Sequence, residues 1–311
     1  MKIAIASGKG GTGKTTVAVN LALSFADFNL QTVYCDCDVE APNGHIFLKP
    51  TSLHKETVTV PVPRVNQELC DGCRKCAEIC QFGAVVVIKG TVIIYPELCH
   101  GCGGCQLVCP QRAIEEIDRP VGEIETGEAG NIRYIGGRLN IGEVRAVPLI
   151  HKLKTKLAPD LVTVIDAPPG TSCPVIETLR GVDYVILVTE PTPFGLNDLI
   201  LALETVHTLG IPCGVVINRS DIGDDAVEEY CDLHGVEILR KIPFSREIAE
   251  AYSRGNILVD TIPDQRRLYA SFAGQLMGSV VGVANSRVIP VPPRENRIEP
   301  VSYTHLTLPT N

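Results

Sequence analysis

The 311-residue sequence has no excess of positive charge, because 28 Lys and Arg residues stand against 36 Asp and Glu residues, for a net charge of −8. A general nucleic-acid-binding surface is therefore not expected. No apolar run is long enough to cross a bilayer, and a phosphate-binding motif begins by residue 8, so we expect no signal peptide. We expect a cytoplasmic protein that binds neither nucleic acid nor a membrane.

Apolar residues, by contrast, make up 45% of the chain, which is enough for one large α/β domain and a smaller one. Cysteine is also abundant, with 13 residues, and eight of these form two groups of four between Cys70 and Cys109. In a reducing compartment, clustered cysteines bind metal rather than pair as disulfides. Outside the two groups, Cys35, Cys37 and Cys173 are interpreted as structural thiols, with metal binding as the alternative and, for Cys173, a redox-active thiol as a further one.

The stretch Ser7–Thr16 reads SGKGGTGKTT and fits the phosphate-loop pattern G-x-x-x-x-G-K-[ST]. A short apolar run, Lys2–Ala6, precedes it as a buried strand, and apolar residues at helical spacing follow it over Thr16–Phe28. Glycines let successive N–H groups point at one anion, and Lys14 is expected to neutralise phosphate while Thr15 takes a Mg²⁺ position. The residues expected to bind nucleotide are Gly8, Gly10, Gly11, Thr12, Gly13, Lys14, Thr15 and Thr16.

Lys9 directly follows the first glycine of this loop, where an extra cation does not easily reach phosphates held by the same loop. The resulting K-G-G-T-G-K-T-T segment resembles the deviant phosphate loop of the MinD/ParA/Mrp superfamily of ATPases, the class that includes the nitrogenase iron protein. The resemblance implies a homodimer that sandwiches ATP, in which Lys9 is catalytic across the interface. The alternative is a solvated surface lysine.

Acidic residues follow two further predicted strands, at the edge where ligands bind in open α/β sheets. Asp36 and Asp38 follow Thr32–Cys35, and Asp166 follows Leu161–Ile165. By the resemblance, Asp38 is a catalytic residue that orients the attacking water, while Asp36 and Asp166 lie at the Mg²⁺. Acids that cap a turn are the alternative for these positions.

Further nucleotide-contacting positions follow from the same resemblance. Gly170 is expected to sense the γ-phosphate in a second switch segment. Asn218, at the end of the strand Cys213–Ile217, is expected to read the adenine edge, and Arg219 beside it is expected to contact the nucleotide. Ile242, Pro243 and Phe244 are expected to line the base pocket.

Two cysteine runs have the spacing of a bacterial two-cluster ferredoxin, C-x2-C-x2-C-x3-C, in which the fourth cysteine of each run binds the other cluster. The first 4Fe–4S cluster is assigned to Cys70, Cys73, Cys76 and Cys109, and the second to Cys80, Cys99, Cys102 and Cys105. Gln81 replaces the usual proline of the first run, whereas Pro110 keeps it in the second. Four-cysteine zinc sites are the alternative, although they rarely use this spacing twice.

These motifs together predict an α/β fold, a doubly wound and mostly parallel sheet of MinD-like P-loop NTPase type with an inserted small α+β dicluster ferredoxin domain. The ATPase domain is predicted at residues 1–58 and 119–288, and the ferredoxin domain at 59–118. Hairpins are expected around Lys89 and Gly90 and within Val121–Gly142. Residues 289–311 are predicted to form a disordered tail, in which 301–311, VSYTHLTLPTN, is interpreted as read-through of a sequencing adapter.

The sequence therefore predicts an ATPase whose cofactors are ATP, Mg²⁺ and two 4Fe–4S clusters. The favoured function is electron transfer to a redox partner through both clusters, coupled to nucleotide-driven closing of the homodimer. The alternative is an ATP-dependent assembly or carrier protein that hands iron–sulfur clusters or a metallocofactor to a client protein. A third hypothesis is a positioning switch of the MinD or ParA type. It lacks support, because the sequence shows no basic amphipathic tail that would bind a membrane.

Overall fold

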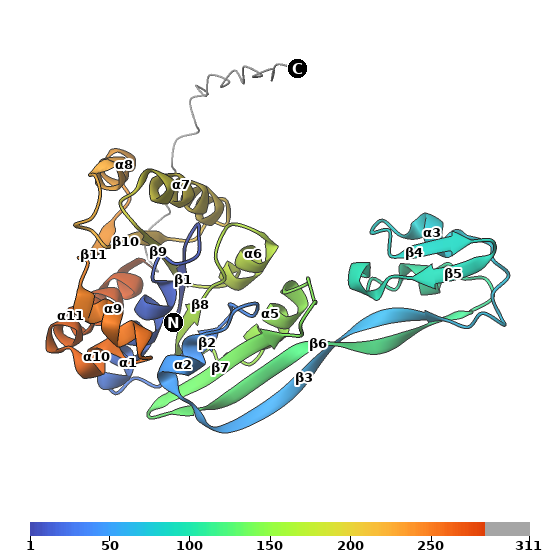
Figure 1. Ribbon diagram of the computed structural model, residues 1–311, viewed down its shortest axis with the longest axis horizontal. Helices are drawn as coiled ribbons and strands as arrows, with labels where there is room; N and C mark the ends of the chain where they lie inside the picture. The colour runs from blue at the N-terminus through green and yellow to red at the C-terminus, as the bar shows by residue number, and fades with distance from the viewer. Residues whose placement is uncertain (284–311) are drawn as a thin grey trace, which may run out of the picture.

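A nine-stranded sheet forms the centre of the molecule in the computed structural model, which describes residues 1–283 (Figure 1). Its strands are β1 (Lys2–Ala6), β2 (Thr32–Asp36), β3 (Thr51–Val65), β6 (Ile114–Ala129), β7 (Ile132–Leu139), β8 (Val162–Asp166), β9 (Tyr184–Thr189), β10 (Cys213–Asn218) and β11 (Ile238–Ile242). They lie in the order β11-β10-β9-β1-β8-β2-β7-β6-β3. Neighbours from β11 to β7 are parallel, and β6 and β3 add to one edge antiparallel. The prediction of an α/β fold with a mostly parallel sheet is confirmed.

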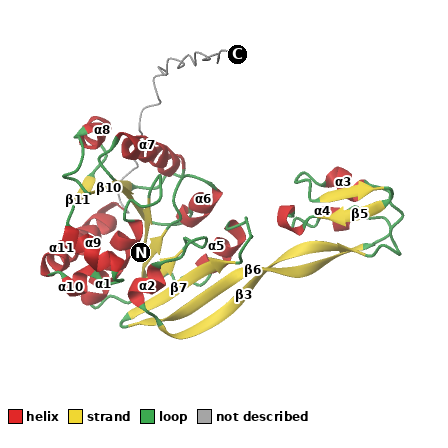
Figure 2. Cartoon of the chain, in the orientation of Figure 1, coloured by secondary structure: helices red, strands yellow, loops and turns green. Residues whose placement is uncertain are grey.

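Helices cover both faces of this sheet (Figure 2). They are α1 (Lys14–Asp27), α2 (Gly44–Leu48), α5 (Val147–Lys154), α6 (Cys173–Leu179), α7 (Pro193–Thr208), α8 (Ala226–His234), α9 (Arg246–Ser253), α10 (Leu258–Thr261) and α11 (Pro263–Val283). Successive side chains of a strand point to opposite faces. Ile5 of β1 accordingly lies in one core with Phe25 of α1, whereas Ala4 lies in the other core with Leu199 of α7. The sheet and these helices are called the body below.

β3 and β6 form a long antiparallel ribbon at the edge of the sheet. Their pairing begins at Thr51 opposite Glu128 and continues to Val65 opposite Ile114. Only the base of the ribbon also pairs with β7, so its tip extends away from the body (Figure 1). The predicted domain boundaries at residues 59 and 118 fall inside these two strands, and the pairing shifts register between Val58 and Thr59.

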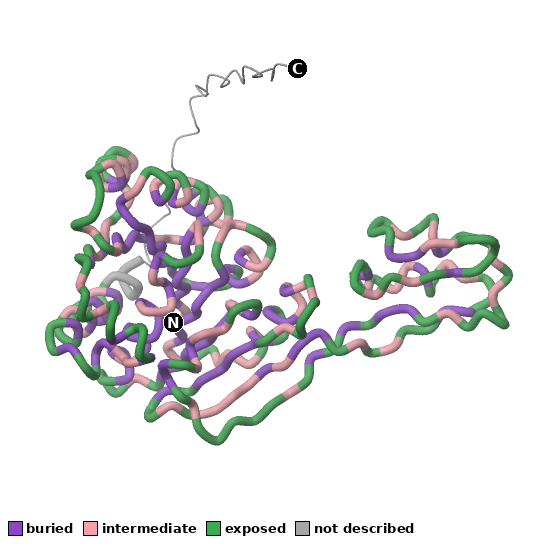
Figure 3. Tube along the Cα trace, viewed as in Figure 1, coloured by how far each residue is buried: buried purple, intermediate pink, exposed green. Residues whose placement is uncertain are grey.

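The tip of the ribbon carries a small α+β unit, the cysteine module (residues 66–113). Its elements are α3 (Lys75–Ile79), β4 (Val85–Ile88), β5 (Thr91–Ile94), a 3₁₀ turn (Pro96–Leu98) and α4 (Gly104–Leu107). β4 and β5 form the hairpin predicted around Lys89 and Gly90, and β6 and β7 form the one predicted within Val121–Gly142. Most of the module is exposed or half-buried, in contrast to the purple interior of the body in Figure 3.

Across residues 1–283, no helix is both long and apolar enough to span a membrane. The predicted tail at 289–311 and the adapter interpretation of 301–311 lie outside the described residues.

Candidate nucleotide and cysteine sites

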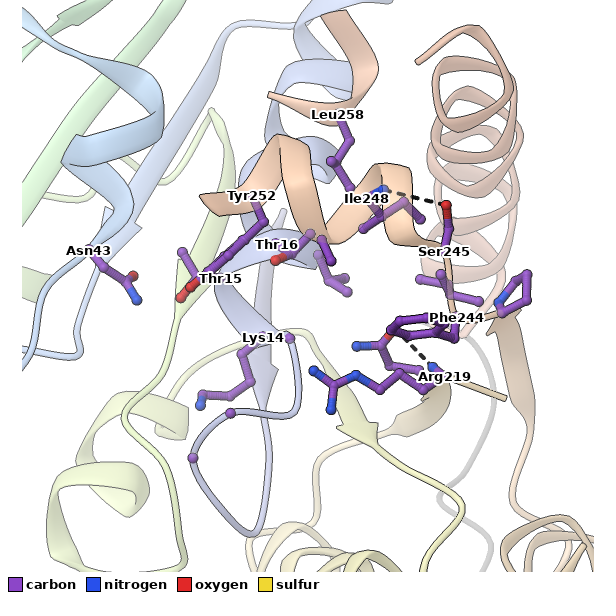
Figure 4. A pocket seen from close by; sticks show the side chains of 18 of the residues that line it. Lys14, Thr15, Thr16, Asn43, Arg219, Phe244, Ser245, Ile248, Tyr252 and Leu258 are labelled. Carbon is purple, nitrogen blue, oxygen red and sulfur yellow. Dashed lines mark hydrogen bonds between the residues drawn. The ribbon is translucent and has the colours of Figure 1, made fainter. Parts of the chain in front are cut away.

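A cavity of about 360 Å³ opens where the parallel strands end, between the loop after β1, the loop after β2 and the β11–α9 connection (Figure 4). The predicted residues that line it are Gly10, Gly11, Gly13, Lys14, Thr15, Thr16, Asp38, Asn218, Arg219, Ile242, Pro243 and Phe244. Its lining adds apolar side chains that include Ile248 and Tyr252 on the α9 side. The cavity thus has one polar end at the loop and one apolar end, as an anionic ligand with an aromatic group requires.

The loop after β1 has the backbone that a bound anion needs. Gly11 and Gly13 have φ of 80° and 98°, which glycine adopts without steric cost. Gly13 is the N-cap of α1 and supplies no side-chain cap, so N–H groups of the first turn remain available to a ligand. Gly8 passes so close to α7 that a Cβ there would stand 2.2 Å from the backbone oxygen of Asp198. Lys14 follows directly and is 7% exposed.

Asn218 connects the end of β10 to the phosphate loop. Its Nδ2 donates to the backbone oxygen of Thr12 at 2.9 Å, and its Oδ1 accepts from the Arg219 N–H at 3.0 Å. Both ends of the amide are therefore engaged within the chain, although Asn218 also lines the cavity. Its predicted role in reading adenine stays a prediction.

Three carboxylates lie together at the end of β2 and β8. Asp36 and Asp166 are opposite each other in register, and both are fully buried. Burial raises the pKa of Asp166 to about 6, and burial followed by the charge of Asp166 raises the pKa of Asp36 well above its usual range. Burial also raises the pKa of Asp38, while Lys14 opposes that shift. A bound cation would stabilise the charged form of all three groups.

Asp36 organises the loop that follows β2. Its Oδ1 accepts from the backbone N–H of Asp38 at 3.2 Å, and its Oδ2 accepts from that of Gly44 at 3.0 Å. These two bonds close the loop onto the site and place Asp38 at the cavity wall. The predicted position of Asp36 beside Mg²⁺ stays a prediction.

Some buried polar atoms around the cavity have no hydrogen-bond partner. Within the described residues they include Thr12 Oγ1, Asn43 Oδ1 and Asp166 Oδ1. A buried polar atom without a partner costs stability, so such atoms mark places where a ligand is expected to supply the missing bond. The donor set, with carboxylate and hydroxyl oxygens beside Lys14, fits Mg²⁺ and phosphate. Asn43 was not among the predicted site residues, because nothing in its sequence context separates it from other loop asparagines.

Lys9 does not line the cavity and is instead bound within its own chain. Its Nζ lies 3.6 Å from Glu190 Oε2, and Arg219 Nη1 lies 2.9 Å from Glu190 Oε1. Glu190, directly after β9, is only 9% exposed. One carboxylate thus holds two predicted functional residues together, Lys9 and Arg219. Glu190 was not among the predicted site residues, since a single acid after a strand is a weak sequence signal.

Gly170 and the two buried acids, Asp36 and Asp166, are also predicted site residues that do not line the cavity. The Gly170 N–H donates to the backbone oxygen of Ser7 at 2.9 Å, which ties the loop after β8 to the start of the phosphate loop. Its neighbour Pro169 reaches the cavity wall instead. The predicted residues outside the lining are Gly8, Lys9, Thr12, Asp36, Asp166 and Gly170.

The two cysteine runs of the module have left-handed backbone conformations at equivalent positions. Gly72 and Arg74 of the first run have φ of 69° and 70°, and Gly101 and Gly103 of the second have φ of 64° and 68°. Each run then starts a short helix, α3 after Arg74 and α4 after Gly103. The left-handed residues wrap the chain around the cysteines of each run. The structure therefore repeats the internal symmetry of the sequence.

The four cysteines predicted to hold the first cluster line one small cavity in the module. They are Cys70, Cys73, Cys76 and Cys109. Backbone N–H groups point at one sulfur of each predicted ligand set, from Ala113 to Cys109 at 3.3 Å and from Gly101 to Cys99 at 3.4 Å, and both of these cysteines lie in the second run. Such N–H···S bonds are typical of thiolate ligands in iron–sulfur proteins.

The second predicted set, Cys80, Cys99, Cys102 and Cys105, is divided between interior and surface: Cys99 and Cys105 are buried, Cys80 is half-buried and Cys102 is exposed. Within residues 1–283, no three His, Cys, Asp or Glu side chains lie close enough together to hold a single metal ion. The assignment of these four cysteines to a second cluster stays a prediction.

The sequence of residues 3–259 matches the family model of the CobQ/CobB/MinD/ParA nucleotide binding domain. The chain belongs to this family. Two uncharacterised proteins of Methanocaldococcus jannaschii are 34% and 31% identical to it over 84% and 82% of this chain, and over 91% and 90% of their own lengths. An iron–sulfur cluster carrier protein of Aquifex aeolicus is 25% identical over 84% of this chain and 62% of its own length.

Solved structures of the MinD type share the fold of this family member. The septum site-determining protein MinD of Pyrococcus horikoshii, solved with Mg-ADP, has a TM-score of 0.58 and 18% identity, and the match covers 91% of this chain and 97% of that one. The cell division ATPase MinD of Pyrococcus furiosus gives 0.56 and 20%. At this identity the likeness establishes the fold, a MinD-like P-loop NTPase sheet.

Proposed function

We propose that this chain binds and hydrolyses Mg²⁺·ATP in the cavity and uses the cycle to control iron–sulfur clusters held by the cysteine module. Membership in a nucleotide-binding family supports the first half, together with the free N–H groups of the loop and the buried Lys14. Thr15 and Asp166 would hold Mg²⁺, with Asp36 behind them. The cation, when bound, supplies positive charge to the β- and γ-phosphates.

In the proposed reaction, Asp38 orients a water molecule toward the γ-phosphorus. The water oxygen forms a bond to phosphorus while the bond from phosphorus to the β–γ bridging oxygen breaks. Lys14 stabilises the developing charge from the same chain. The partner subunit's Lys9 does so across an ATP-bound homodimer, after it has left its ion pair with Glu190.

The proposed adenine end of the site consists of Asn218, Arg219 and Pro243. Phe244 and Tyr252 supply apolar walls there. Because Arg219 also pairs with Glu190, the base pocket and Lys9 are connected through one carboxylate. Gly170, tied to Ser7, would relay the presence of the γ-phosphate to the segment before α6.

We propose that the clusters are cargo, which the module accepts and passes to a client protein. The observation that carries this proposal is the exposure of Cys73 and Cys102, one in each predicted ligand set, on a module that projects from the body (Figure 1). An exposed ligand can be replaced by an incoming thiolate without unfolding its surroundings. Relatives that bear the name iron–sulfur cluster carrier protein favour this function over the electron transfer expected from the sequence.

The test is a transfer assay with the whole chain, loaded with iron and sulfide under anaerobic conditions. The acceptor is an apo-protein that needs a 4Fe–4S cluster for activity, and its activation is followed with MgATP, with MgADP and with neither. We expect activation, with a rate that changes several-fold between the nucleotide states. Cys73→Ser and Cys102→Ser should alter the rate, whereas Cys213→Ser in β10 of the body is the matched control. Absence of activation while the clusters persist in the chain would overturn the carrier proposal.

The doubled ferredoxin spacing favours electron transfer as a second candidate function, because such sites usually hold their clusters permanently. This candidate predicts a different result in the same preparation. The clusters stay with the chain, their EPR signal changes on addition of MgATP, and chemical reduction changes the ATPase rate. Indifference of both signals, together with transfer, would favour the carrier function alone.

A further inference from the structure

A tyrosine that the proposed chemistry does not use lies directly behind the Mg²⁺ site. Tyr34 is on β2 and is 0% exposed. Its hydroxyl donates a hydrogen bond of 3.0 Å to Oδ2 of Asp166, on the neighbouring strand β8. The other carboxylate oxygen, Oδ1, is buried and accepts no hydrogen bond of ordinary geometry among the described residues, and the carboxylate also interacts with the side chain of Thr15. The two carboxylate oxygens of Asp166 thus have different environments, because Oδ2 accepts a hydrogen bond from Tyr34 and Oδ1 does not.

The same hydroxyl also touches the end of the loop that follows β2. A Cβ at Gly44 would stand 2.3 Å from Tyr34 Oη, so only glycine allows this approach. Gly44 donates its N–H to Asp36, and the preceding Asn43 faces the cavity with an unpartnered Oδ1. The Tyr34 hydroxyl therefore lies between the carboxylate after β8 and the start of α2.

We infer that Tyr34 is a positioning residue for Mg²⁺·nucleotide, which acts by fixing Asp166 with Oδ1 toward the cation. A carboxylate rotates freely about its last bond unless one oxygen is held, and a hydrogen bond to that oxygen leaves the other directed at the site. The inference rests on the Mg²⁺·nucleotide half of the proposed function and is independent of the cysteine module.

The chain provides a matched control for the tyrosine hydroxyl. Tyr134 on β7 is opposite Tyr34 in register, and their rings are stacked with centroids 6.2 Å apart and an angle of 14°. Tyr134 is also buried, with 2% exposure, but its hydroxyl does not bond to Asp166. Tyr34→Phe and Tyr134→Phe therefore remove the same atom from the same core, and only the first removes the contact with the carboxylate.

The experiment measures the affinity of the full-length chain for a fluorescent ADP analogue, in EDTA and in saturating Mg²⁺. The ratio of the two dissociation constants is the gain that Mg²⁺ provides. We expect Tyr34→Phe to reduce this gain about tenfold, since loss of a group that orients a metal ligand typically costs 10–100-fold in metal affinity. Its affinity in EDTA should stay unchanged, and Tyr134→Phe should keep the full gain.

The outcomes separate this inference from the proposed function. If the wild-type protein shows no gain from Mg²⁺, the proposed Mg²⁺ site fails and the role of Tyr34 fails with it. If the wild type shows the gain and Tyr34→Phe keeps it, only the positioning role is overturned. An equal loss in both tyrosine variants indicates a general packing effect and also overturns it. Should Tyr34→Phe not fold, Gly44→Ala displaces the hydroxyl from the other side, and an undiminished gain there contradicts the inference.

Discussion

The body and the cysteine module of this chain are stabilised in different ways. The body buries two extensive apolar cores, one on each face of its sheet. A small separate cluster consists of Cys76, Val85, Val92 and Cys105 of the module with Ile114 of β6, so two of its five members are predicted cluster ligands, while Ala84 and Cys99 of the module pack into the larger cluster of the body and ribbon. Units of this size rarely fold on apolar burial alone. If the module binds clusters as proposed, we expect the body to fold by itself and the module to depend on those clusters.

The largest expected effect tests whether two lysines of the body have separate roles. Both Lys9→Ala and Lys14→Ala should lower ATP hydrolysis by about 10³-fold or more, because each removes a charge from the proposed transition state. Nucleotide affinity should fall only for Lys14→Ala, since Lys14 lines the cavity and Lys9 pairs with Glu190 instead. Turnover rates and equilibrium binding are measured on each variant, and cluster content should be unchanged. Lys152→Ala, at an exposed position of α5, is the control, and normal turnover in Lys9→Ala would contradict the dimer mechanism.

Removal of iron should destabilise the module and leave the body unaffected. After chelation, we expect hydrogen exchange of the β4 and β5 amides to accelerate about 100-fold or more, because the remaining apolar core is too small to hold the hairpin closed. Amides of β1 and β8 in the body should keep their protection. Exchange is followed by mass spectrometry on the loaded and chelated chain. Equal protection of the module in both forms would show that its core is sufficient without clusters.

Asp166→Asn should stabilise the body against unfolding and leave the stability of the module unchanged. Burial raises the pKa of Asp166 from 3.8 to about 6, so the folded state binds this proton more tightly than the unfolded state does. Ionised Asp166 therefore lowers the stability of the folded state above pH 6. This destabilisation disappears as the pH falls below the pKa that Asp166 has in the unfolded state. In EDTA without nucleotide, we expect the variant to be more stable than wild type by roughly 1–3 kcal/mol at pH 8, with little difference near pH 4. Urea unfolding at both pH values tests this, and a gain that grows toward acid would refute it.

The smallest expected effect concerns the backbone of the module. Arg74 has φ of 70° at a position where the second cysteine run has Gly103. A non-glycine residue pays a steric cost in this region, so Arg74→Gly should stabilise the loaded module by about 1 kcal/mol. Lys75→Gly, one residue later in α3, should destabilise it by a similar amount. Chelator-induced loss of module protection gives the measurement, and the same sign for both variants would contradict the backbone argument.

Local sequence patterns were sufficient for the parts of the site that lie in one segment. The loop from Gly8 to Thr16 and the two cysteine runs are contiguous, and their backbone follows from glycine positions and spacing. The residues after strands, such as Asp38 and Asn218, could be placed together because parallel strands end at one edge of the sheet. The same reasoning predicted that most strands of the sheet are parallel.

Contacts between distant segments were beyond sequence reasoning. Glu190 gains its role only because folding brings Lys9 and Arg219 to either side of it. Tyr34 reads as an ordinary strand residue until β8 lies beside β2. Glu143, before α5, is paired with Arg145 nearby in the chain and with Arg119 from β6, a contact that the sequence does not indicate.

The length of the ribbon was also beyond local pattern. Its pairing joins residues 51–65 to residues 114–128, across the whole module, and no short window of sequence reports such a partner. The single-strand signals of β3 and β6 are weak, because their exposed face carries charged and polar residues. Only their mutual pairing makes them a continuous element.

The ribbon has a consequence for the ancestry and engineering of the chain. Val65 and Ile114, which flank the module, are paired neighbours on adjacent strands. The polypeptide leaves and re-enters the sheet at one rung of the ladder, so the module is topologically the loop of a β-hairpin. A short turn can take the place of such a loop without a change in strand order. Gain or exchange of a module at this position therefore requires no rearrangement of the nucleotide-binding sheet.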